Sequence, residues 1–136
     1  MRSESKLTTL LSASGANGWS AVFPVNDYRI VQIVISTASN ASGTIKVAGS
    51  MLSGDDVDYT ASAEPGNEWD NIALYDLQDP SSIIAGDTGV VYAGTDAVRQ
   101  LKVNVDAMKN IAVNLSGYAA GSFTVKAIGY SEEYGV

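Results

Sequence analysis

The sequence predicts an all-β protein, a single antiparallel β-sandwich with jelly-roll or immunoglobulin-like connections. The strongest observation comes from residues 101–105, 111–115 and 123–127, where apolar and polar residues alternate. Successive side chains of a strand point to opposite faces of a sheet, so a period of two is typical of strands with one buried face. The joints between these stretches are short and rich in Gly, Asn, Asp and Ser, which favours antiparallel neighbours.

The N-terminal part of the chain shows three further strand patterns. A first short strand is expected over Lys6–Ala13. A second is expected over Trp19–Val25, where Pro24 indicates a strand edge or end because it cannot donate a ladder hydrogen bond. The most apolar strand is expected over Tyr28–Thr37, since aliphatic side chains occupy both of its faces.

The middle of the chain alternates less regularly. A polar hairpin loop is expected over Ala38–Gly43, followed by a strand over Thr44–Ser50 and a long loop over Leu52–Glu68. The pattern resumes over Trp69–Leu77, which favours a strand that Asp79-Pro80 ends. Two shorter apolar stretches complete the set, at residues 83–84 and 90–93. About eight or nine strands without an amphipathic helix pattern are typical of a sandwich.

Length and composition indicate one domain. A chain of 136 residues can bury about two-thirds of the surface of its unfolded state, and 46% apolar against 17% charged residues is too apolar for disorder. Residues 1–14 are either an N-terminal arm or the first strand, and both alternatives stay open. Residues 15–131 are expected to form the sandwich, and residues 132–136 an acidic tail.

Charge and composition argue against several classes of partner. The net charge is −7 and the basic residues are scattered, which argues against nucleic acid because phosphate contacts need clustered Lys and Arg. No apolar run approaches the ~20 residues that cross a bilayer, so no membrane partner is expected. No export signal is visible, so synthesis is expected in the cytoplasm.

Catalytic chemistry has little support in the residues. The chain contains no histidine, the usual base for a serine nucleophile, and no cysteine that could supply a thiolate. Glu64, Glu68 and Asp70 lie close in sequence and could form the carboxylate pair of a glycosidase. Because acidic surface loops are far commoner than such pairs, we expect a protein that is not an enzyme.

One acidic segment is a candidate metal site. Asp55, Asp56 and Asp58 lie in a turn-prone segment, and hard cations such as Ca²⁺ bind clustered carboxylate oxygens. The segment lacks the glycine at the sharp turn and the closing glutamate of the EF-hand calcium loop. We therefore expect a solvated loop, with no metal and no other cofactor.

The aromatic residues support an alternative function, that of a carbohydrate-binding module. Trp19 shares its predicted face with Phe23 and Val25, so we expect it in the core. Trp69 lies between two acidic residues at the end of the long loop, which makes it the better candidate for an exposed ring that stacks on a glycan.

Several segments from Trp19 onward occur in a recognisable order. They are Gly18-Trp19 with Phe23-Pro24-Val25, Val31–Ile35 with Ser42–Val47, Trp69–Leu74, Leu101–Val105, Ile111–Leu115 and Gly121–Gly129. In pattern and composition, and over most of the chain, this order resembles the small β-sandwich structural proteins of tailed-bacteriophage virions.

That resemblance implies a non-enzymatic virion component, often trimeric. The resemblance does not choose the location on the particle. Because the net charge of −7 argues against contact with packaged DNA, we expect a capsid decoration (cement) protein that forms a homotrimer on the outer capsid surface and binds the major capsid protein or another virion protein. Tail, fibre and baseplate modules are the alternatives. The residues themselves indicate three candidate partner-binding side chains, because an arm that stayed free would leave these apolar groups without a contact: Leu7, Leu10 and Leu11. The expected location is the virion, after assembly in the host cytoplasm.

Overall fold

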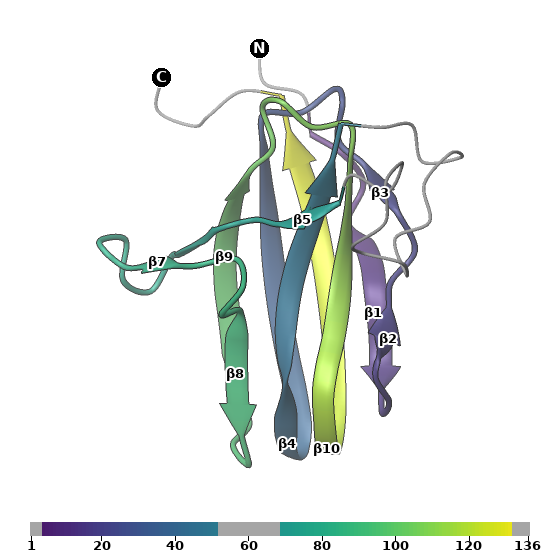
Figure 1. Cartoon of the computed structure of the whole chain (residues 1–136), viewed down its shortest axis with the longest axis vertical. Coiled ribbons are helices and arrows are strands. Elements are labelled where there is room, and N and C mark those ends of the chain that lie inside the picture. The colour runs from purple at the N-terminus through teal and green to yellow at the C-terminus, as the bar shows by residue number, and fades with distance from the viewer. Residues whose placement is uncertain (1–3, 52–68, 132–136) are drawn as a thin grey trace.

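The structure is all-β and antiparallel, as the alternating sequence pattern predicted. The computed structural model describes residues 4–51 and 69–131, and every regular element in these two ranges is a strand (Figure 1). These ranges therefore contain no helix that could span a membrane. The strands are β1 (Thr8–Ser14), β2 (Gly18–Trp19), β3 (Phe23–Pro24), β4 (Ile30–Ser50), β5 (Asp70–Asn71), β6 (Leu74–Asp76), β7 (Ile83–Ile84), β8 (Val90–Ala93), β9 (Val98–Asn104) and β10 (Asn110–Tyr130).

Two long strands, β4 and β10, run through the whole sheet. Each contains 21 residues, and they pair antiparallel along their full length. Ile30 lies opposite Tyr130 at one end of this ladder, and Ser50 lies opposite Asn110 at the other. The register is interrupted within Ser116–Ser122 of β10, and both strands fold back on themselves there (Figure 1). As a result, the sheet doubles over into two layers.

Shorter strands complete each layer. The first layer contains the N-terminal half of β4 and the C-terminal half of β10, in the order β1-β10-β4-β9-β6-β7. In the second layer, β2 and β3 pair with the N-terminal half of β10, and β5 and β8 pair with the C-terminal half of β4. The ladder continues through β4 and β10, so the layers are two parts of one folded sheet. This order does not confirm the predicted jelly-roll or immunoglobulin-like connections.

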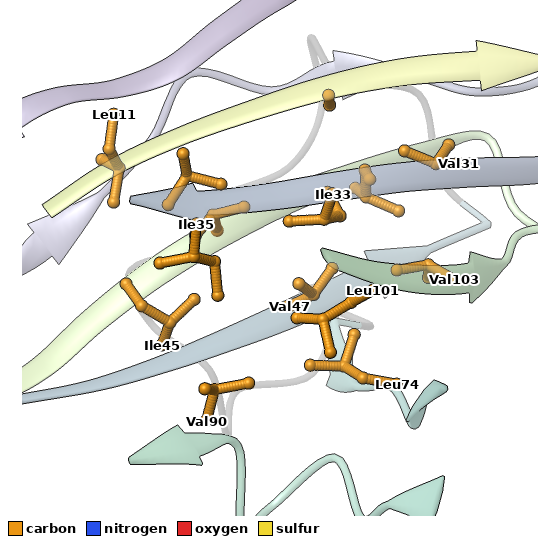
Figure 2. Packing of buried hydrophobic residues seen from close by; sticks show 14 of the residues in the cluster. Leu11, Val31, Ile33, Ile35, Ile45, Val47, Leu74, Val90, Leu101 and Val103 are labelled. Atoms are coloured by element: carbon orange, nitrogen blue, oxygen red, sulfur yellow. The ribbon is translucent and has the colours of Figure 1, made fainter. Parts of the chain in front are cut away.

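The two layers enclose one apolar core. Val31, Ile33 and Ile35 of the first layer lie across from Ile45 and Val47 of the second (Figure 2). The three alternating C-terminal stretches place every second side chain in this core, as predicted. Those side chains are Leu101, Val103, Val105, Ile111, Val113, Leu115, Phe123, Val125 and Ala127, all of them at most 1% exposed. Burying a large aliphatic side chain contributes about 1.5–3 kcal/mol, so this cluster is the main source of stability.

The observed strands differ from the predicted ones in four places. The three C-terminal stretches are not antiparallel neighbours: residues 111–115 and 123–127 are two halves of β10 that pair with β4 and not with each other, and β9 also pairs with β4. Trp19–Val25 is divided into β2 and β3, because Ser20 interrupts it: the backbone N–H of Val113 donates to the Ser20 hydroxyl at 2.9 Å. Trp69–Leu77 is likewise divided into β5 and β6. The hairpin loop predicted over Ala38–Gly43 is wrong, since this segment lies inside β4 and its two flanks pair with β10 instead of with each other.

The bend in β4 combines a left-handed backbone with acceptors from another loop. Ser39 and Asn40 have φ angles of 63° and 57°, which are unfavourable for most residues but better tolerated by Asn. Asp96, between β8 and β9, accepts hydrogen bonds from the backbone N–H groups of Asn40 and Ala41 at 3.1 and 3.0 Å. These two bonds hold the pKa of the Asp96 carboxyl below its usual value, and the bond from Ala41 has the larger effect.

The bend in β10 requires glycine. Gly117 and Gly121 have φ angles of 60° and 79°, and a Cβ atom on Gly121 would lie 2.5 Å from the Cα atom of Ala41. The two bends are therefore in backbone contact. The Tyr118 hydroxyl donates to the carbonyl of Gly121 at 2.7 Å, and its ring packs edge-to-face against the buried Phe123.

We expect Gly121→Ala to destabilise the fold far more than Gly117→Ala. Both substitutions add about 1–2 kcal/mol of strain at a positive φ, but only Gly121→Ala also forces a methyl group against the backbone of Ala41. At Gly117 no atom lies within 4 Å of the added Cβ position, which makes this variant the matched control. Urea unfolding measures both changes, and equal losses of unfolding free energy would contradict a need for contact between the bends.

We expect Asp96→Asn to lower the stability of the protein at neutral pH. In acid, the stability of the variant should decrease less steeply with falling pH than that of the wild type. The folded pKa of Asp96 lies below 3.8, so its contribution is complete above pH 3.8 and is lost as the pH falls through the folded value. Asp76, whose pKa is also lowered, chiefly by a hydrogen bond from the Gln78 N–H, is unchanged in this variant. The wild-type melting temperature should therefore fall more steeply than that of the variant as the pH decreases below 3.8. If the melting temperatures of the two proteins changed with pH by the same amount, this role of Asp96 would be contradicted.

Candidate functional site

A groove crosses the outer face of the second layer. It has a volume of about 360 Å³, and its walls come from β2, β4, β5 and β10. The lining residues are Trp19, Lys46, Ala48, Trp69, Asp70, Asn71, Asn114 and Ser116. Both tryptophans of the sequence belong to this set, so we name it the two-tryptophan groove.

The alternation of β4 and β10 determines which side chains reach the groove. Ile45 and Val47 point into the core, so Lys46 between them points to the outer face. On the neighbouring strand, Asn114 lies directly opposite Lys46, and Ser116 follows on the same face. The same ladder that builds the core therefore sets the positions of the polar groups outside it.

Two small side chains make room for Trp69 on this face. Ala48 lies opposite Ala112 in the ladder, and Trp69 packs with both in a small cluster separate from the main core. Trp69 is only 6% exposed. The prediction of an exposed Trp69 is therefore wrong, because the two alanines leave a space on the sheet that the indole ring fills.

Trp19 lies on the same outer face and not in the main core. It is partly buried and packs against the cluster that contains Trp69. The sequence placed it on the face of Phe23, but the interruption at Ser20 breaks the alternation between these two residues. Of the two tryptophans, Trp19 thus has the more exposed ring, the reverse of what was predicted.

Two amides of the groove are held in place, and its described lining carries one charge of each sign. Asn114 Nδ2 donates to the carbonyl of Gly18 at 3.3 Å, and Asn71 Nδ2 donates to Oδ1 of Asp87 at 3.0 Å. Lys46 contributes an ammonium group and Asp70 a carboxylate. This arrangement suits hydrogen bonding to a neutral polar molecule.

The predicted carboxylate sites fall almost entirely outside the described ranges. Five of these side chains lie within residues 52–68: Asp55, Asp56, Asp58, Glu64 and Glu68. The sixth, Asp70, is exposed in β5. Among residues 4–51 and 69–131, no group of three His, Cys, Asp or Glu side chains could hold a metal ion. The predicted tail, residues 132–136, also lies outside what the structure describes.

The three N-terminal leucines have different environments. Thr8–Ser14 forms β1 and pairs with β10, so of the two alternatives for this segment the structure shows a strand. Leu11 is 8% exposed in the core, and Leu10 packs against that core. Leu7 is 58% exposed and is the one of the three that keeps most of its side chain available to a partner.

The open edge of β8 is a second candidate surface, which the sequence pattern did not predict. Within the described ranges, β8 pairs with β4 alone. Gly94 N–H donates to the carbonyl of Ala41 at 2.9 Å. The alternation of an antiparallel ladder then turns the backbone polar groups of Val91 and Ala93 away from β4. Val91 is also 62% exposed, and only the strand pairing could have shown that it lies on an edge.

The fold occurs in solved structures of low sequence identity, whereas no protein-family model and no curated protein match the chain. It is similar to the SPBc2 prophage-derived protein YomS, with a TM-score of 0.70, 14% identity and coverage of 96% of each chain. It is also similar to the PBSX exported protein XepA, with a TM-score of 0.69 and 14% identity, over 96% of this chain but only 38% of XepA. The chain therefore has the fold of YomS and of a part of XepA.

Proposed function

We propose that the chain is a non-enzymatic structural protein of a bacteriophage particle, which works by binding copies of itself and neighbouring particle proteins. The observation that carries this proposal is the fold shared with the SPBc2 prophage-derived protein YomS over 96% of both chains. The sequence pattern, which resembles that of small virion proteins, supports it independently of the fold.

The β8 edge is the surface best suited to such contacts. An open strand edge presents backbone donors and acceptors to a strand of another chain, and main-chain pairing then supplies affinity. Val91 adds an apolar side chain at this edge. A closed homo-oligomer would cover the edge in every copy, and the resemblance to virion proteins predicts a trimer.

Within the particle, we propose a capsid decoration protein on the outer surface. The net charge of −7 opposes contact with the phosphates of packaged DNA, and this favours the outside of the shell. There the protein would bind the major capsid protein. A tail, fibre or baseplate module is the alternative, and it differs in the particle protein that the chain contacts.

Val91→Lys is expected to dissociate the oligomer and to leave a folded monomer. A charged side chain on a strand edge opposes pairing with another strand, and at 62% exposure the lysine remains solvated in the monomer. Leu7→Lys is the matched control, because Leu7 is 58% exposed and lies outside β8. Light scattering after size exclusion measures the mass. Dissociation by Leu7→Lys alone would assign the interface to the N-terminal segment, and a monomeric wild type would refute self-association.

Wild-type protein is expected to co-sediment with assembled capsids that lack it, and not with isolated tails. The expectation follows from an outer-surface contact with the major capsid protein. Ultracentrifugation of mixtures with purified capsids and with purified tails measures both interactions. Binding to tails alone would favour the tail alternative, and binding to neither particle part would overturn the proposed function.

A further inference from the structure

We propose that the two-tryptophan groove binds a pyranose ring of a carbohydrate. This site goes beyond the proposed function, which requires only contacts between proteins. Specific small-molecule sites combine apolar and aromatic walls with a few well-placed polar groups. In this groove indole rings provide the aromatic wall, and amide, hydroxyl, carboxylate and ammonium groups provide the polar contacts.

The aromatic wall has one partly exposed ring with a rigid support. Trp19 is the ring that a sugar can contact, and it packs against the cluster formed by Trp69, Ala48 and Ala112. The weakly polar C–H face of a pyranose stacks on such an aromatic surface, and a tryptophan with two side-chain torsions loses little conformational entropy on binding. The cluster of Trp69, Ala48 and Ala112 therefore supports Trp19.

The polar groups face the groove from both sides. Lys46 and Asn114 are opposite neighbours on β4 and β10, which brings their Cβ atoms to within about 5.5 Å of each other. Asp70 and Asn71 approach from β5. The hydrogen bond from Asn114 to the Gly18 carbonyl orients this amide before any ligand arrives. Together these groups can donate to and accept from vicinal hydroxyl groups.

Charge and size select the class of ligand. Among the described lining residues Lys46 and Asp70 contribute one charge of each sign, and the Asp87 carboxylate bonds to Asn71, so a neutral polyol fits better than a phosphate or another anion. An apolar peptide would have to bury Lys46 and Asp70 without hydrogen-bond partners, which is costly. The volume of about 360 Å³ lies at the lower end of the range of ligand sites, as expected for one or two sugar rings.

Intrinsic fluorescence tests this proposal directly, because both tryptophans of the chain line the groove. The probes are the methyl glycosides of glucose, galactose and N-acetylglucosamine, followed by a purified bacterial surface polysaccharide. We expect a saturable change in emission with at least one of them. A response to the polysaccharide alone identifies an extended surface glycan, and a response to a methyl glycoside identifies a single ring as sufficient.

Matched variants show whether the response comes from this site. Trp19→Ala and Asn114→Ala are each expected to weaken binding by about tenfold or more, which corresponds to about 1.4 kcal/mol. Gln32→Ala is the control, because Gln32 carries an amide on the opposite layer, where it bonds to Gln100, and its removal should leave the affinity unchanged. If Trp19→Ala fails to fold, the partly exposed polar position 114 still provides the test.

Two results would overturn the proposal. The first is a wild-type protein whose emission no probe changes, or a response that Asn114→Ala leaves intact. The second is a change of emission when Val91→Lys dissociates the oligomer, together with no response to glycans in the oligomer or in the monomer. Such a change of emission would mean that a neighbouring copy covers the groove in the oligomer. That second result would refute the sugar site and support the proposed self-association, so the two proposals fail separately.

Discussion

The backbone contact between two bends, where Gly121 meets Ala41, is the constraint on which the rest of this structure depends. Because β4 and β10 pair along their full length, neither strand can fold back unless the other does so at the same level. The local means differ: β4 uses Ser39 and Asn40 in a left-handed conformation, and β10 uses glycines. A sheet that remained flat would leave its inner face in water, and doubling over buries that face against itself.

The pairing of β4 and β10 positions side chains both in the core and in the outer groove. Side chains such as Ile45 and Val47 point inward and join the core, while Lys46 and Ala48 alternate with them and line the outer groove. The positions of Lys46 and Ala48 are therefore set by the same ladder that builds the core. A site on paired strands is held more precisely than a site on a loop, and a preorganised binding site needs this precision.

The proposed interactions use different parts of the surface. The proposed self-association would use the edge of β8, where the main chain of Val91 and Ala93 faces away from β4. The sugar site uses the outer face of β4 and β10, where Trp19 and Asn114 meet. Neither requires a base, a nucleophile or a metal. Because the edge of β8 and the groove are different surfaces, both proposed interactions can take place in one molecule.

The sequence by itself determined which side chains are buried in the regular strands, because a period of two is a local property of the chain. Leu101, Val103 and Val105 lie in the core for that reason. It could not determine which strands pair, since pairing joins segments far apart in the chain, and the segment predicted as a hairpin loop became the bend of β4. The exposure of Trp69 was also decided by tertiary structure. Its ring is buried because Ala48 and Ala112, from two distant strands, leave the space that it fills.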